Sequence, residues 1–339
     1  MLGNFQLLFQ GFGTALNPIN ILPCVIGGAL GIFVGAMPGI GSVSGCSLLL
    51  PITYKMNPTA AIIMLAGIYY GNMYGGAYSA ILLNIPGDSP AVCTAMEGYP
   101  LSKRGLAGKA LFTANFCSFI GGTVGIIFLT IGGPLLANIG LKFGPTETAA
   151  LVFFALTSIG WMLGDSPAKG LIATGLGVLL STVGVDGSTG YFRYTFGTTS
   201  LLAGINFVPL VIGMFGFTQV MLLMGGKGTE DRAKEYVGKL RYKDCALDKK
   251  TTVGLIPQAI RDSILGEFIG FLPGAGGTSA SLITYMVERK INKNRANMGK
   301  EDVGTYEGVC ASEAANNAAA VGAFVPLLSL GIPGSSTTA

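Results

Sequence analysis

Long apolar stretches separated by short polar joints dominate the pattern along the chain. Uncharged runs cover residues 1–54, 56–87, 110–141, 194–226 and 314–339. Several of them exceed the ~20 residues that cross a bilayer core as a helix. The pattern therefore predicts an all-α polytopic membrane protein. Its first part holds a hairpin at 18–54, a broken span at 59–97 and ordinary spans at 106–139, 145–164, 167–185 and 199–224.

Two basic segments set the expected orientation of the second part. Residues 227–252 form one long polar linker rich in Lys and Arg, and a second basic loop covers 289–300. By the positive-inside rule both are cytoplasmic. The stretch 253–288 must then enter the membrane and return on the same side, which predicts a re-entrant hairpin. A second broken span is expected at 306–339.

An internal repeat links the two parts. The pattern Gly31-x-x-x-Gly35-x-x-Pro38-Gly39-x-Gly41-x-x-Ser44 recurs from Gly266 to Ser279 at a constant offset of 235. Farther along, Ile85-Pro86-Gly87 recurs as Ile332-Pro333-Gly334 at an offset of 247. Two motifs in the same order indicate a duplicated unit.

The count of crossings predicts how the two units are oriented. The first repeat, residues 1–226, has one hairpin without net crossing and five crossing spans. An odd number places the second repeat, residues 253–339, upside down in the membrane, as an inverted-topology repeat. A second unit as long as the first would continue well beyond Ala339, so we expect this chain to be truncated.

The four helix breaks are the candidate site for substrate and ion. Proline stops a helix and glycine permits an open backbone, which is tolerated in a membrane where protein or a wet cavity satisfies the freed groups. Hydroxyls and carbonyls suit a hard cation, whereas new helix N-termini suit an anion. The candidate residues are Pro38, Gly39, Gly41, Ser42, Ser44, Asn84, Pro86, Gly87, Asp88, Ser89, Pro273, Gly274, Gly276, Gly277, Thr278, Ser279, Pro333, Gly334, Ser335, Ser336 and Thr337, with sodium expected near Ser44 and Ser279.

Simpler interpretations of the same residues stay open. The glycines can serve only close helix packing, and the prolines only kinks. Asp88 is either a cation ligand or the N-cap of a helix that begins near Ser89. Asn316 and Asn317 are either ligands in the second broken span or helix-to-helix hydrogen-bonding residues.

Composition narrows the class of protein. Only 11% of the residues are charged, against roughly 25% in soluble domains. The chain has no histidine, so the usual zinc ligand and general base are missing, and we expect neither an enzyme nor a cofactor beyond a coupling cation, sodium or proton. A net charge of +4 without a nucleic-acid motif indicates no nucleic-acid partner.

The segments GAMPGIGSVSG, NIPGDSPAVCTAMEGYPLSKRG, GFLPGAGG and GIPGSSTT resemble the tripartite tricarboxylate transporter family, specifically its TctA-type large membrane subunit. The resemblance implies a permease in the bacterial cytoplasmic (inner) membrane that takes up citrate or related carboxylates with a cation gradient. It implies two protein partners, a small TctB-type membrane subunit and a periplasmic TctC-type solute-binding protein, in contact with membrane lipid. The alternatives are a permease for another small organic anion and a structural membrane subunit.

Overall fold

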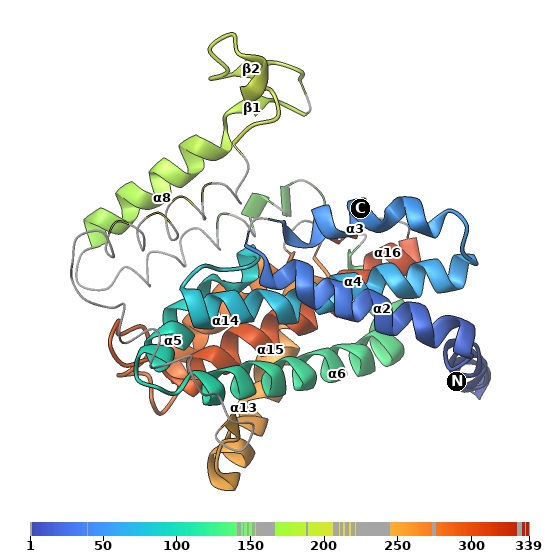
Figure 1. The fold of residues 1–339 in the computed structure, drawn as a ribbon. Coiled ribbons are helices and arrows are strands. Elements are labelled where there is room, and N and C mark those ends of the chain that lie inside the picture. Colours follow the sequence, from blue (N-terminus) through green and yellow to red (C-terminus); the bar gives the residue numbers. More distant parts are fainter. Residues whose placement is uncertain are drawn as a thin grey trace.

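A computed structural model of the chain is mostly helical, in agreement with the all-α class (Figure 1). The α-helices are α1 (Leu2–Ala15), α2 (Pro18–Ala36), α3 (Gly41–Thr53), α4 (Pro58–Leu83), α5 (Val92–Lys103), α6 (Ala107–Gly140), α8 (Pro167–Ser181), α13 (Lys249–Gly270), α14 (Gly276–Ile291), α15 (Tyr306–Gly322) and α16 (Phe324–Leu330). Short 3₁₀ helices cover Ser89–Ala91 and Thr199–Leu201. The structure describes residues 2–38, 40–140, 144, 146–147, 149–150, 153, 167–187, 189–205, 210, 213, 217, 221, 245–272, 276–330, 334–335 and 337–338.

A small antiparallel sheet departs from the sequence prediction. Strands β1 (Gly184–Val185) and β2 (Phe192–Arg193) pair beyond the end of α8 and project from the helical body (Figure 1). The span predicted at 167–185 thus ends as a helix at Ser181, because β-branched residues follow and favour extended backbone. The span predicted at 199–224 begins in a 3₁₀ turn, and most of it, like most of 145–164, lies outside the described residues.

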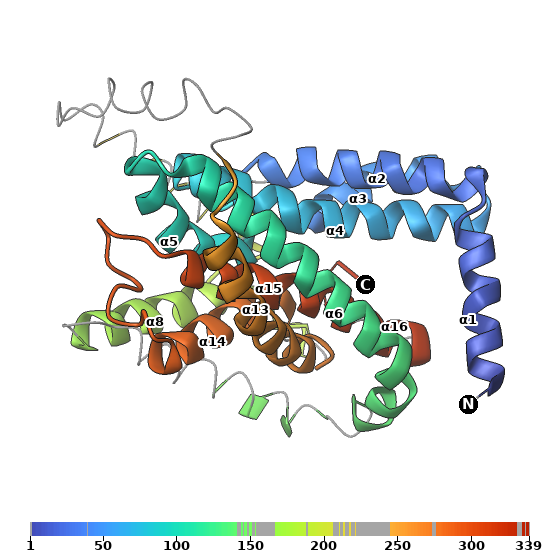
Figure 2. The same cartoon turned by 90° about the horizontal axis from the view of Figure 1, so that it is seen from below.

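In the first repeat, α2 packs along α4 (Figure 2). Both helices begin with an Asn-Pro pair, in which Asn17 and Asn57 cap the helix through the side chain and the proline fills the first turn. The contact is made by small residues: a methyl group added at Gly27, Gly31 or Gly35 would overlap the backbone of α4. Such close approach is typical of helices that pack through dispersion contacts.

The second repeat packs in the same way. Helix α13 runs along α15, and glycines again meet the backbone of the partner helix. The contacts of Gly31 with Ile68 and of Gly35 with Asn72 recur as those of Gly266 with Ala315 and of Gly270 with Ala319. These pairs are related by the offsets of 235 and 247 found in the sequence, so the two copies share their packing as well as their motifs.

Helix α15 forms the centre of the described bundle. It contacts α6, α13, α14 and α5, and every residue from Gly308 to Gly322 is buried. Figure 1 shows it between α6 and α14. Its many alanines have small side chains, so the neighbouring helices can pack close to its backbone. Helix α6 and the α13–α14 hairpin therefore share one core around α15.

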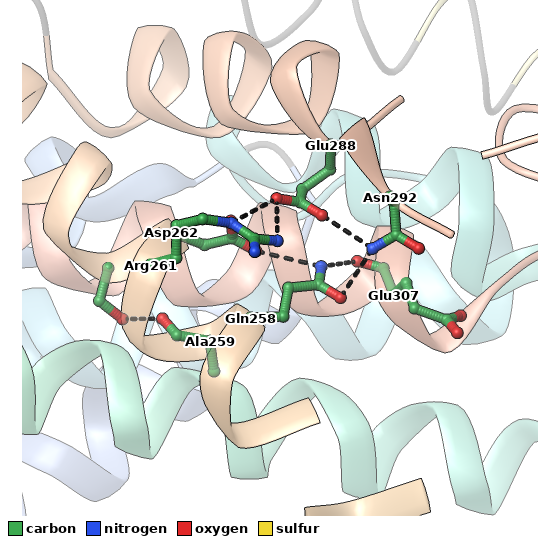
Figure 3. A network of polar contacts seen from close by, with 8 residues as sticks. Gln258, Ala259, Arg261, Asp262, Glu288, Asn292 and Glu307 are labelled. Carbon is green, nitrogen blue, oxygen red and sulfur yellow. Dashed lines mark hydrogen bonds and ion pairs between the residues drawn. The ribbon is translucent and has the colours of Figure 1, made fainter. Parts of the chain in front are cut away.

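Helices α13 and α14 form a hairpin braced by polar contacts (Figure 3). Arg261 on α13 forms an ion pair with Glu288 on α14 at 2.5 Å. About one turn farther from the hairpin tip, Asn292 donates a hydrogen bond to the side-chain oxygen of Gln258 at 3.0 Å. The pairs run forward along the first arm, from Gln258 to Arg261, and backward along the second, from Asn292 to Glu288. The two arms are therefore antiparallel.

The start of α13 is fixed by Asp248. The carboxylate accepts hydrogen bonds from the hydroxyl of Thr251 at 2.6 Å and from its backbone amide at 3.0 Å. These bonds favour the ionised form and hold the pKa of Asp248 below its usual value. The cap is therefore intact at neutral pH and is lost only as the pH falls through that lowered pKa.

Among the described residues, two helices are both long and apolar enough to cross a bilayer: Pro18–Ala36 and Ala107–Gly132. Helix α13 misses this criterion because its apolar part carries Arg261, Asp262 and Glu267, and α15, which contains Glu313, is one residue too short at 17 residues. The side chains of Asp262, Glu267 and Glu313 are buried inside the bundle. The multi-pass arrangement of the whole chain thus stays a prediction.

Candidate functional site

Asp88 lies where the first broken span meets the first hairpin. Its Oδ2 accepts hydrogen bonds from Nδ2 of Asn72 at 2.6 Å, from Oγ of Ser42 at 3.1 Å and from the amide of Ser42 at 3.3 Å. Its Oδ1 accepts from the amide of Ser89 at 2.8 Å. Asp88 is therefore an N-cap, as one of the two interpretations held, and it serves the first turn of α3 as well as the 3₁₀ helix at Ser89.

Contacts between the copies bring all four breaks together. The hydroxyl of Ser42 lies 2.8 Å from that of Thr337, and Thr278 donates to the hydroxyl of Ser89 at 2.8 Å. A methyl group added at Gly277 would lie 3.3 Å from Cγ of Pro90. Each hairpin tip thus contacts the break of the other copy.

Two of these contacts are reciprocal. The offset of 235 relates Ser42 to Gly277, and the offset of 247 relates Pro90 to Thr337. The contact of Ser42 with Thr337 is therefore the counterpart of the contact of Gly277 with Pro90. Reciprocal contacts between like surfaces are typical of a two-fold axis; the inverted repeat itself stays a prediction.

Local backbone chemistry explains where the helices break. Helix α4 ends at Asn84, which has a left-handed φ of 58° and whose amide bonds the carbonyl of Ser79. Pro86 then has no amide to continue the helix, and Gly87 packs against the carbonyl of Gly35. At the hairpin tips, Gly41 and its counterpart Gly276 have φ values of +67° and +59°, which favour glycine.

Other predicted site residues are not joined to this cluster. Ser44 is exposed on α3, and within the described part of the chain neither Ser44 nor Ser279 joins the hydrogen bonds among the breaks. Pro38 precedes the tip of the first hairpin, while Gly334 packs against Ala323 and Ser335 bonds the hydroxyl of Thr338 at 3.2 Å. The remaining predicted residues lie outside the described ranges: Gly39, Pro273, Gly274, Pro333 and Ser336.

A buried polar network extends behind the breaks. Ser281 donates to the carbonyl of Pro90 at 2.8 Å and lies 2.8 Å from the hydroxyl of Ser312. The next hydroxyl is that of Thr94, 2.8 Å from Ser312 and 2.5 Å from the carboxylate of Glu313. The network therefore connects the cluster to a carboxylate in the centre of α15.

Helix α6 closes this network. Ser118 donates to Glu313 at 3.0 Å and accepts from Nδ2 of Asn317 at 2.8 Å. Asn317 also donates to the side-chain oxygen of Asn316 at 2.6 Å. These contacts match the helix-to-helix interpretation of the asparagine pair. Glu313 was not predicted as a site residue, although a carboxylate inside an apolar helix is itself a signal of function.

The loop at 292–305 is tied to the first repeat by Glu97. This buried carboxylate accepts from the hydroxyl of Tyr285 at 2.5 Å, from the amide of Gly299 at 2.6 Å, and from the amide and hydroxyl of Thr305 at 2.7 and 2.9 Å. The corresponding connection in the first repeat is only residues 54–57. The longer loop thus adds a contact between the two repeats.

A cavity of about 350 Å³ adjoins the cluster. Its walls come from α3, α4, α16 and residues 337–338 of the break in the second copy. They include Cys46, Tyr69, Phe324 and Thr337. The hydroxyl of Tyr69 lies 3.5 Å from that of Ser335. A pocket of this size is within the range for small ligands.

The charges of the cluster restrict what it can bind. Asp88 is the one ionisable carboxyl in the four motifs, and they contain neither Lys nor Arg. Oxygen ligands around a carboxylate suit a hard cation. An anion would have to be bound by helix N-termini and hydroxyls.

Fold and site together define a helical membrane protein in which two packed copies of a hairpin and a broken helix share their breaks. The chain belongs to the tripartite tricarboxylate transporter TctA family, whose sequence profile matches residues 21–339. This is a family of membrane transporters rather than of enzymes.

Two relatives come from Agrobacterium vitis. An uncharacterized 52.8 kDa protein in the TAR-I ttuC' 3' region is 42% identical over 331 residues, which are 96% of this chain and 63% of that protein. An uncharacterized protein in the TAR-II ttuC' 3' region is 50% identical over 68 residues, 20% of this chain and 27% of that protein. The chain thus spans less than two thirds of either relative. No solved structure is significantly similar to it.

Proposed function

We propose that the chain is the permease part of a cation-coupled secondary transporter for tricarboxylates such as citrate or related carboxylates. It works in the bacterial inner membrane with a TctB-type small membrane subunit and a TctC-type periplasmic binding protein. The observation that carries the proposal is the meeting of four helix breaks through reciprocal contacts between two copies. Such breaks bind substrate and ion in transporters with inverted repeats. A permease for another small organic anion would use the same geometry.

The two copies offer different sites. In the first copy, the N-terminus of α3 is already occupied by the carboxylate of Asp88. The offset of 247 places the neutral Ser335 at the corresponding position of the second copy. The N-terminus of α14, at Gly276 and Gly277, therefore suits the carboxylate of a substrate. The oxygens of Asp88 and Ser42 suit the coupling cation.

Uptake into vesicles that contain the complete complex tests this function. We expect accumulation of citrate or a related carboxylate only when a sodium or proton gradient is present. Ser42→Ala should raise the cation concentration for half-maximal uptake about tenfold, because a hydrogen bond to a charged group contributes roughly 1.5–3 kcal/mol.

Ser44→Ala is the matched control on the same helix, since Ser44 is exposed. An effect of Ser44→Ala with a silent Ser42→Ala would return the ion site to the position first predicted near Ser44 and Ser279. Accumulation that is independent of any ion gradient would contradict the proposed coupling.

The inverted arrangement makes a prediction about sidedness. Single cysteines at Lys250 and Lys293, at the two ends of the α13–α14 hairpin, should both react only from the cytoplasmic side. A cysteine at Lys55 should react from the periplasmic side. Labelling with a membrane-impermeant maleimide in a cysteine-free background measures this. If Lys250 and Lys293 were labelled from opposite faces, both the hairpin and the inverted repeat would be excluded.

A further inference from the structure

Glu267 is a fully buried carboxyl group with no hydrogen-bond partner among the described residues. Its exposed fraction is 0%, and neither carboxylate oxygen has a donor within the described part of the chain. One oxygen faces Gly125 of α6, where an added methyl group would come within 2.9 Å of it. The same methyl group would touch Val321 of α15, so the carboxyl lies between two apolar helix surfaces.

The three other buried glutamates of the described chain have hydrogen-bond donors; those of Glu288 are Arg261 and Asn292. Glu97 accepts four hydrogen bonds, and Glu313 accepts from Thr94 and Ser118. Glu267 has none of these contacts, although it is buried to the same extent. An isolated ionised carboxylate in an apolar environment is so costly that the group takes up a proton instead. The surroundings of Glu267 therefore favour the neutral acid in this conformation.

Within the described part of the chain, the helices packed against Glu267 place no basic side chain beside its carboxyl group to stabilise the ionised form. Tyr70 of α4 is close enough to interact electrostatically with Glu267. On the packed helices, Asp262 lies more than one turn away along α13, and Glu313 lies about two turns from Val321 along α15. The charged residues of α14, Glu288, Arg289 and Lys290, are at its far end, and Lys109 is at the far end of α6.

Comparison of the two copies indicates that the helix packing at Glu267 does not require a carboxyl group. The offset of 235 relates Glu267 to Ile32. The carbonyls of both residues meet a glycine of the partner helix, Ile32 at Gly75 and Glu267 at Gly322. The backbone packing is thus the same with an apolar side chain, so the carboxyl is an addition specific to the second copy.

Glu267 is also linked to the breaks. It lies on α13, near the tip of the hairpin, and Thr278, the residue that donates to Ser89, lies on the other arm, near the start of α14. Its neighbour Tyr70 packs with Tyr69 and Phe324, and Tyr69 contacts Ser335. A change in the charge of Glu267 would therefore alter the electrostatic surroundings of Tyr70, which packs on a residue that contacts Ser335 in the break of the second copy.

We propose that Glu267 is a proton-binding site of the transporter, neutral in this conformation and deprotonated when rearrangement of the α6–α13–α15 contact opens it to water. The proposal rests on the proposed function and specifies a proton among the ions that move with the substrate. Intramembrane carboxyls in proton-coupled carriers have this role.

Labelling with dicyclohexylcarbodiimide tests the protonation without transport. The carboxylic O–H adds across one C=N bond of this lipid-soluble reagent to give an O-acylisourea. Its acyl group then migrates from oxygen to nitrogen, which leaves a stable N-acylurea with no leaving group. In the membrane-embedded full-length protein, we expect peptide mass spectrometry to find the adduct on Glu267, with a yield that falls as the pH rises. Glu97 should stay unmodified because its oxygens are occupied, and Glu267→Gln should remove the adduct.

Transport tests the coupling. In vesicles with the complete complex, Glu267→Gln should abolish accumulation driven by a pH gradient while purified protein keeps its elution profile and thermal stability. Glu301→Gln, in an exposed loop, is the matched control and should behave as wild type.

The outcomes separate the two proposals. An unmodified Glu267, a pH-independent adduct yield, or normal pH-driven accumulation by Glu267→Gln would each overturn the proton site. A wild-type complex that carries no carboxylate would contradict the proposed function instead, and labelling would still decide whether Glu267 holds an exchangeable proton.

Discussion

Replacing Asp88 by alanine should abolish substrate accumulation and lower the free energy of unfolding by about 2–4 kcal/mol. The carboxylate accepts from Asn72, from Ser89 and twice from Ser42. Its removal would leave these donors without an acceptor and two helix starts without a cap. Uptake into vesicles and thermal unfolding of the purified protein measure the two effects.

Two variants separate the role of charge from that of the cap. Asp88→Asn keeps an oxygen that can cap Ser89, so it should recover part of the stability but not the dependence on the cation. Asp302→Ala removes an exposed carboxylate and should change the unfolding free energy by no more than about 0.5 kcal/mol. Full transport by Asp88→Ala would exclude the cluster as the ion site.

Gly27→Ala should destabilise the protein by about 1–3 kcal/mol, the usual cost of overpacking. The added methyl group would overlap the backbone of Met64, so α2 and α4 would have to separate. Since α2 leads directly to the first hairpin tip, the contact of Ser42 with Asp88 should loosen as well. Thermal stability in detergent and the uptake rate are the measurements.

The adjacent Gly28→Ala is the control, because a methyl group there meets nothing within 4 Å. It should be neutral or stabilising, by up to about 1 kcal/mol from helix propensity. Gly121 and Gly122 on α6 form a second pair of this kind: a methyl at Gly121 would overlap Ala314, and one at Gly122 meets nothing. Equal effects within either pair would show that the glycines do not act through close packing.

The helix breaks were predictable because their chemistry is local. Proline, glycine and the hydroxyls that follow them mark the same positions in sequence and structure, as at Asn84–Ser89. The duplication was visible because it conserves spacing. The choice between Ser42 and Ser44 depends on which face of α3 meets the other copy, and this is set by packing that no single segment encodes.

The buried carboxyls were not predictable from composition alone. Glu97, Glu267 and Glu313 stand beside long apolar runs, where a charge is normally taken as the end of a span. All three are fully buried. Glu97 and Glu313 accept hydrogen bonds from other segments of the chain, whereas Glu267 has no donor among the described residues. The short sheet at β1 and β2 was not predicted either, since the apolar residues of β1 continue the apolar run of α8.

The longer connection in the second repeat has an energetic consequence. If the two copies were identical, the inward-open and outward-open states of an inverted repeat would be exchanged by the symmetry and would have equal free energies. The loop at 292–305, held by Glu97, has no equivalent in the four-residue turn at 54–57. Under the proposed function, the two orientations would therefore differ in energy even without a gradient, and the empty carrier would rest mainly on one side.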